Sequence, residues 1–197
     1  MLFVRGLFAI ALGRRQPETR AMRFLTDSEC AAWCAERGYP TRTYQGYAGL
    51  CADTEPVGFE RVAFPSPPDS GKRVWLARFL LSLLDPAPEL LFWLGDWAAW
   101  PSCQHMPLFA RFREALGEQR PLIETPGHLV AVDEADDGVS ILAVALLFMW
   151  DCHVITASGR DVIFVSHDEE GWFGSRDSSV AAFAAKRLEQ SLGSGAA

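Results

Sequence analysis

The chain has 197 residues, of which 49% are hydrophobic and 22% charged, and its formal net charge at pH 7 is −7. This composition excludes an intrinsically disordered chain, and the length suits one domain that needs no disulfide framework or metal to bury a core. The acidic balance argues against nucleic acid or an anionic membrane as partner and favours a basic protein, although moderate acidity also simply keeps a protein soluble.

Residues 1–21 precede the first well-formed helix start. Their apolar run comes before Arg14 and Arg15, whereas a secretory signal carries its positive charge first, and the run is too short to span a bilayer. We therefore expect 1–21 to be an extension, 22–192 to form a single domain and 193–197 to be a loose tail. The five cysteines include no CxxC pair, which is typical of reduced thiols and predicts a cytoplasmic protein.

The first half of the domain is predicted to hold two helices and short strands. Thr26-Asp-Ser-Glu29 is typical of a capping box, and Gly38 ends the helix that it begins. Ser70 is placed to cap the second helix, which Pro86 ends. The elements expected in this half are a helix at 27–35, strands near 44–47 and 59–64, and a helix at 70–84.

The second half is predicted to be richer in regular structure. The apolar spacing in 106–116 sets Leu108, Phe109, Phe112 and Leu116 on the inner face of a helix. Residues 121–128 are predicted to form an extended stretch and a turn. The other elements expected here are a buried strand at 89–94, a helix at 133–149 that begins with four acids, a hairpin at about 150–167 and a helix at 178–192.

The hairpin at about 150–167 is the clearest unit. Val, Ile, Phe and Thr dominate both of its strands, and its turn is centred on Ser158-Gly159. Helices and hairpins mix along the chain without a repeated strand–helix alternation. The predicted fold class is therefore α+β, with helices packed on a small, mainly antiparallel sheet that includes this hairpin.

Three chemistry-bearing side chains fall on one predicted face of this hairpin. Pairing about the turn sets Asp151 opposite Ser166, and alternation along the strand puts His153 on the same side. Together the three could form an acid–base or nucleophilic site. However, Ser166 lacks the flanking glycines of a nucleophile elbow, so a half-buried hairpin whose Asp and His hydrogen-bond each other is the simpler interpretation.

A second interpretation is a metal site at the end of the hairpin, because imidazole and carboxylate groups gather there. Its ligands would be His153 or His128 together with His167, Asp168, Glu169 and Glu170. No HExxH or comparable spacing occurs, so a solvated turn is the simpler interpretation. The glycines match neither a phosphate loop nor a dinucleotide-binding pattern, and no cofactor is expected.

A third interpretation is an exposed recognition surface. Acidic side chains lie beside aromatic ones at two places, a pattern that suits a cationic partner through apolar anchors and complementary charge. The predicted contact residues are Asp96 and Trp97 at the first place, and Asp168, Glu169, Glu170, Trp172 and Phe173 at the second. These aromatic residues could instead be core, and several tryptophans could line the apolar pocket of a small-molecule sensor.

The segment from Trp150-Asp-Cys-His through Val-Ile-Phe-Val-Ser-His-Asp-Glu to Gly-Trp-Phe resembles the C-terminal hairpin of small acidic bacterial proteins, some of them immunity proteins of polymorphic toxin systems. Trp97-Ala-Ala-Trp-Pro-Ser and Thr125-Pro-Gly-His128-Leu share this resemblance, which spans about 90–175. It implies a non-enzymatic protein that binds and blocks a toxin. We therefore expect a non-catalytic domain that binds a basic protein, with a small hydrolase or metal-dependent enzyme and a small-molecule sensor as alternatives.

Overall fold

The computed structural model describes residues 22–44, 47–50, 58–84, 86–97 and 102–193, and the predicted extension at 1–21 and the tail at 194–197 lie outside them. The main sheet is formed by β1 (Arg23–Leu25), β4 (Glu60–Pro65), β5 (Glu89–Leu94), β6 (Gly127–Ala131), β7 (Cys152–Thr156), β8 (Asp161–Val165) and β9 (Glu170–Ser175), and a separate hairpin by β2 (Thr41–Tyr44) and β3 (Tyr47–Leu50). The helices are α1 (Asp27–Ala35), α2 (Ser70–Leu83), α3 (Met106–Ala115), α4 (Ala135–Phe148) and α5 (Ser178–Leu192), with 3-10 turns at Ser102–His105 and Val132–Glu134.

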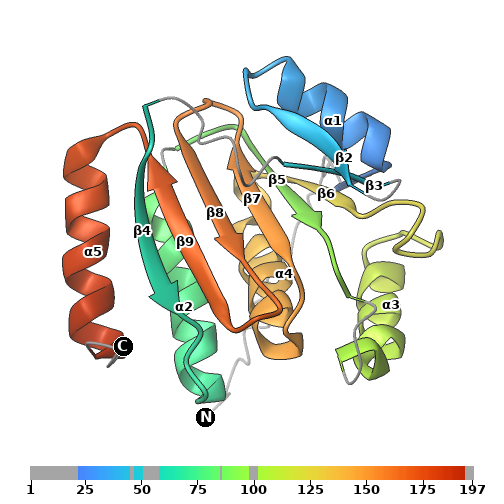
Figure 1. Cartoon of the computed structure of the whole chain (residues 1–197). Helices are drawn as coiled ribbons and strands as arrows, with labels where there is room; N and C mark the ends of the chain where they lie inside the picture. The colour runs from blue at the N-terminus through green and yellow to red at the C-terminus, as the bar shows by residue number, and fades with distance from the viewer. Residues whose placement is uncertain (1–21, 45–46, 51–57, 85, 98–101, 194–197) are drawn as a thin grey trace, which may run out of the picture.

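The seven strands follow the order β1-β6-β5-β7-β8-β9-β4, and every neighbouring pair is antiparallel (Figure 1). The predicted α+β class is confirmed. The hairpin of β7 and β8 is confirmed with its register, since Cys152 pairs with Val165 and His153 with Phe164. The sheet is larger than expected because β1, β6 and β9 join it.

Strand β9 occupies a stretch that the sequence suggested was exposed surface. Instead it lies between β8 and β4, and its Phe173 faces the core with no exposed area. A Cβ at Gly171 would lie 2.5 Å from the Phe164 carbonyl oxygen and 2.7 Å from Phe64 Cε2. The glycine is therefore needed for strand packing rather than for a turn.

Two helix starts follow local capping chemistry. The predicted capping box of α1 is confirmed: the Glu29 N–H donates to Thr26 Oγ1 at 3.3 Å, and the Thr26 N–H donates to Glu29 Oε2 at 2.7 Å. For α2 the cap is Asp69 rather than the expected Ser70, because the Asp69 carboxylate accepts from the Lys72 N–H at 2.8 Å. Both caps satisfy amide groups that the first helical turn leaves without partners.

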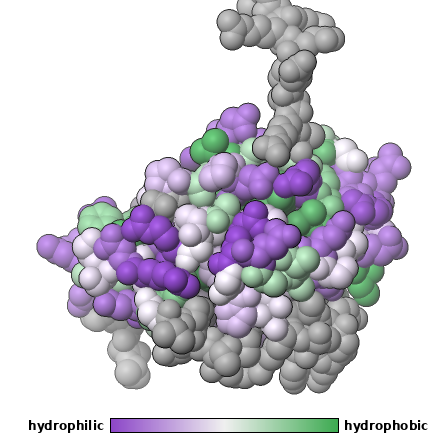
Figure 2. All heavy atoms as spheres, turned by 90° about the horizontal axis from the view of Figure 1, so that it is seen from above, coloured by the Kyte–Doolittle hydropathy of each residue, from purple (hydrophilic) through white to green (hydrophobic). Residues whose placement is uncertain are grey.

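The surface of the described residues is mostly polar. Seen from above, from the end where β7 joins β8, hydrophilic residues cover much of the face (Figure 2). Leu108, Ile123, Val132 and Phe183 are the most exposed large apolar side chains in the described part, and they come from different segments of the chain. None of the described helices has the length and apolar character that crossing a membrane requires.

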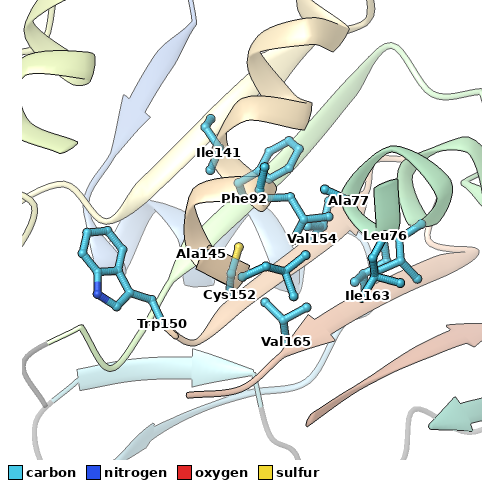
Figure 3. Packing of buried hydrophobic residues seen from close by; sticks show 14 of the residues in the cluster. Leu76, Ala77, Phe92, Ile141, Ala145, Trp150, Cys152, Val154, Ile163 and Val165 are labelled. Atoms are coloured by element: carbon cyan, nitrogen blue, oxygen red, sulfur yellow. The ribbon is translucent and has the colours of Figure 1, made fainter. Parts of the chain in front are cut away.

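The main core lies between the sheet and the helices behind it in Figure 1. In the close-up of Figure 3, Leu76 of α2 and Ile141 of α4 approach the sheet residues Phe92, Val154 and Ile163. All five side chains are fully buried. This continuous apolar layer holds the strands, and therefore their connections, in fixed positions.

Helix α1 covers part of the opposite face of the sheet. Cys30 and Cys34 lie on its buried side, as their spacing of four residues predicts, and they pack in a second cluster with Leu91 and Ile155. Trp93 belongs to the same cluster, and its Nε1–H donates to Asp27 Oδ1 at 2.8 Å. Figure 1 shows α1 beside the β2–β3 hairpin, with the β4–β9–β8 part of the sheet facing the viewer.

Candidate functional site

Three connections at one end of the sheet carry carboxylates that converge on one histidine. Asp96 follows β5, Asp151 precedes β7, and Asp168 lies beside His167 in the turn between β8 and β9. Antiparallel pairing brings these connections together, because β5 and β8 run towards this end and β7 starts from it. We call Asp96, Asp151, His167, Asp168 and Glu170 the acidic end.

His167 is held firmly by Asp151. Its Nδ1–H donates to Asp151 Oδ1 at 2.7 Å, and its backbone N–H donates to the same oxygen at 2.8 Å. Its Nε2 lies 3.5 Å from Asp168 Oδ1. The hydrogen bond to Asp151 raises the pKa of His167 against the opposing effect of burial, and the negative charges of Asp151, Asp168 and Asp96 raise it further. The imidazole therefore keeps its proton to a higher pH than a free histidine.

Gly95 fixes the connection that carries Asp96. Its N–H donates to the Asp151 backbone carbonyl at 2.7 Å, and a Cβ at this position would lie 3.2 Å from Asp151 Cβ. The absence of a side chain thus allows the two connections to approach closely. Beyond it the Asp96 side chain is exposed, while Trp97 is half-buried against the main core. The arrangement sets an exposed carboxylate next to a partly exposed aromatic ring.

The predicted trio of Asp151, His153 and Ser166 is not assembled. Strand β7 begins at Cys152, so Asp151 lies outside the ladder and turns to His167. His153 lies within strand β7, tilted against its cross-strand partner Phe164 with 4.5 Å between ring centroids, and burial lowers its pKa to about 3. The Ser166 hydroxyl accepts from the Asp168 N–H at 3.1 Å. The alternation that predicted one shared face fails where the regular strand ends.

The predicted metal ligands do not converge either. Among the described residues, no group of three or more His, Cys, Asp or Glu side chains is placed to hold a metal ion. His128 is fully buried beside Phe109, its Nδ1–H donates to the Pro126 carbonyl at 3.1 Å, and burial lowers its pKa to about 3. His153 lies within strand β7 beside Phe164, so only His167 and Asp168 of the predicted ligands lie close to each other.

The second predicted recognition segment divides between surface and interior. Asp168 and Glu170 are exposed, as expected. Glu169 is partly exposed and forms an ion pair with the buried Arg73 at 2.9 Å. Trp172 is half-buried beneath the Arg61 guanidinium, 4.3 Å from its Cζ to the ring centroid. Phe173 is fully buried, so its predicted exposure is wrong; alternation in β9 turns it inward.

A hollow of about 350 Å³ lies beside α3, and none of the sequence motifs indicates it directly. Its lining includes Met106, Phe109, Arg113, Glu118, Arg120 and Leu122, and we call it the α3 hollow. Leu108, expected on the inner face of α3, is 64% exposed, whereas Arg113 is only 2% exposed. Arg113 follows Phe109 by four residues and so shares its buried side, which is the signal that could have indicated this site.

Comparisons with known proteins give no match to this chain. No family model, no curated protein and no solved structure matches the chain. The resemblance to immunity proteins therefore stays a prediction, and function is inferred from the side chains that the fold brings together.

Proposed function

We propose that the protein is a non-catalytic binding domain that holds a basic protein partner at its acidic end, as an immunity-type inhibitor holds a basic toxin. The observation that carries the proposal is the convergence of Asp96, Asp151 and Asp168 from three separate connections onto His167. Gathered carboxylates on a rigid sheet end create a negative potential that attracts lysine and arginine side chains. The net charge of −7 extends that attraction over longer distances.

The surroundings of His167 favour binding over acid–base catalysis. A histidine that acts as a general base needs a hydroxyl, thiol or water-binding position in front of its free ring nitrogen. Here Nε2 faces the Asp168 carboxylate, and Nδ1 is committed to Asp151. The imidazole thus cross-links two acidic connections, and it sets the shape of the surface that a partner meets.

The acidic end offers both kinds of contact that strong interfaces use. Asp96, Asp168 and Glu170 have exposed carboxylates, which can pair with arginine or lysine. Trp97, next to Asp96, presents part of its ring, and aromatic residues of this kind are common interface anchors. Deprotonation of His167 removes a positive charge from the centre of this surface, so binding of a basic partner should strengthen as the pH rises through the pKa of His167.

The test is capture of a partner from host lysate, followed by affinity measurement with the purified protein. The variant Asp96→Asn/Asp168→Asn removes two exposed charges, and Glu60→Gln/Asp136→Asn is the matched control at the opposite end of the sheet. We expect one basic protein to bind the wild type and the control, and the first variant to bind at least about tenfold more weakly. The affinity of the wild type for this partner should also fall at high salt.

Two results would count against the proposal. A partner that binds Asp96→Asn/Asp168→Asn as tightly as the wild type does not use the acidic end. A partner with an acidic surface, or one whose affinity ignores salt, is not held by charge complementarity. If the captured protein is toxic when expressed alone, rescue of growth by the wild type but not by the variant tests the immunity-type role.

A further inference from the structure

The α3 hollow is lined by a buried cation, Arg113, whose charge the described residues offset only in part. Arg113 is 2% exposed, and its Nη2–H groups donate to the Thr125 carbonyl at 2.9 Å and to Thr125 Oγ1 at 2.5 Å. Its Nε is buried and has no hydrogen-bond partner in the described part of the chain. No carboxylate forms an ion pair with it there.

The acidic residues of the hollow are already committed elsewhere. Glu118 pairs with Arg120 at 2.6 Å, and Glu114 pairs with Arg111 at 2.6 Å. The charge of Glu118 also raises the pKa of Arg113, but its carboxylate is held by Arg120, so the guanidinium of Arg113 has no carboxylate within ion-pair distance in the described part. The Phe24 ring centroid lies 5.5 Å from Arg113 Cζ, a cation–π contact that provides no counter-ion.

An unpaired buried guanidinium is unusual because burial of a charge is unfavourable unless an opposite charge or hydrogen bonds compensate. Burial lowers the pKa of Arg113 to about 10, so it still carries its charge at neutral pH. The fold therefore keeps a positive group at the side of an apolar hollow. A ligand that brings a negative charge would relieve this imbalance.

We propose that the α3 hollow binds a small organic carboxylate, whose anionic group pairs with Arg113 and whose apolar part packs against Phe109 and Leu122. A carboxylate matches the planar fork of a guanidinium, and Arg113 lines the hollow with one N–H group, Nε–H, that has no partner in the described part of the chain. The volume of about 350 Å³ lies at the lower end of the range for small-molecule sites.

This inference goes beyond the proposed binding of a basic protein and does not depend on it. The probes are benzoate and its uncharged analogue benzamide, each added to the whole protein at constant ionic strength. We expect benzoate to shift the Arg113 Nε–H resonance and the backbone amide resonances of α3 in heteronuclear NMR spectra, and benzamide to leave the Nε–H resonance in place. Because this readout uses the wild type, it does not depend on how a variant folds.

A pair of variants then assigns the site. Arg113→Met should weaken benzoate binding by about tenfold or more, since a hydrogen-bonded charge pair is lost. Arg187→Met removes the same charge from the exposed side of α5, outside the lining of the hollow, and should leave binding unchanged. Equal effects of benzoate and benzamide, equal effects of the two variants, or an Nε–H resonance that benzoate does not move would each overturn the proposal.

Discussion

Arg73 joins three parts of the fold through one side chain and gives a sharp test of the packing. Its Nε–H donates to the Pro67 carbonyl at 2.6 Å, and its Nη1–H donates to the Leu146 carbonyl at 3.1 Å, near the C-terminus of α4. Its Nη2–H donates to Glu169 Oε1 at 2.9 Å. The carbonyls of a last helical turn lack partners within the helix, so Arg73 acts as a cap supplied by another helix.

Replacing Arg73 with Met keeps an unbranched apolar side chain but removes every donor. Two buried acceptors, the carbonyls of Pro67 and Leu146, then lose a charged partner, and each such hydrogen bond contributes about 1.5–3 kcal/mol. Removing the buried guanidinium also removes its desolvation cost, which offsets part of this loss. We expect Arg73→Met to lower the free energy of unfolding by about 3 kcal/mol.

Glu169→Gln is the matched control because it removes only the ion pair. The Glu169 side chain is 54% exposed, and exposed ion pairs contribute about 0–1 kcal/mol. Urea unfolding followed by tryptophan fluorescence measures both variants against the wild type. If Glu169→Gln destabilises the protein as much as Arg73→Met, or if Arg73→Met changes the free energy of unfolding by less than about 1 kcal/mol, capping of α4 by Arg73 is refuted.

Two further substitutions test local geometry. Asp151→Asn should lower the pKa of His167 towards its ordinary value of 6.5, which NMR titration of the imidazole measures. The stability that the raised pKa of His167 contributes is fully present below the pKa of the unfolded chain and is lost as the pH rises through the folded pKa. The wild type should therefore lose more stability than the variant over that pH interval. Parallel profiles of stability against pH would contradict this. Gly171→Ala should destabilise by about 1–3 kcal/mol through contact with Phe64, and an unchanged urea midpoint would show that β9 tolerates a Cβ.

The elements that the sequence predicted well are those whose signals are local. The strand Glu89–Leu94 and the helix Ser178–Leu192 have the predicted bounds, because an apolar run and a helical stripe between clear ends are enough to define them. The register of β7 on β8 also follows from local information, since the turn at Ser158-Gly159 fixes which residues pair. In each case the deciding interactions span few residues.

The missed elements depend on partners that are distant in the chain. Residues Glu170–Ser175 carry two glycines and acidic neighbours, which indicate a turn, yet pairing with β4 more than 100 positions earlier makes them a strand. Strand β6 likewise forms by pairing with β1 and β5, which lie earlier in the chain. A strand rich in glycine gains its stability from cross-strand pairing such as that between Gly171 and Phe64.

The candidate sites show the same limit at the level of single side chains. The sequence indicated that acidic and imidazole groups gather near residue 168, but not that Asp151 would leave the strand and bind His167. The helical spacing places Arg113 on the same side as Phe109, but it does not show which groups would surround a guanidinium there. Charge placement depends on where a strand or helix ends and on what packs against it, and both are tertiary properties.

The two candidate sites differ in how their charges are paired. The chain has 25 acidic side chains, yet among the described residues none pairs with the buried guanidinium of Arg113, while Asp96, Asp151 and Asp168 act on one imidazole. The first arrangement leaves a buried cation without a direct ion pair, and the second gathers like charges that one imidazole balances only while it is protonated. Local conflicts of this kind in an otherwise consistent fold are typical of binding sites, because a ligand of opposite charge relieves each of them. The two sites also call for opposite ligands, a cationic protein surface and a small anion, so neutralising variants at one site should leave binding at the other intact.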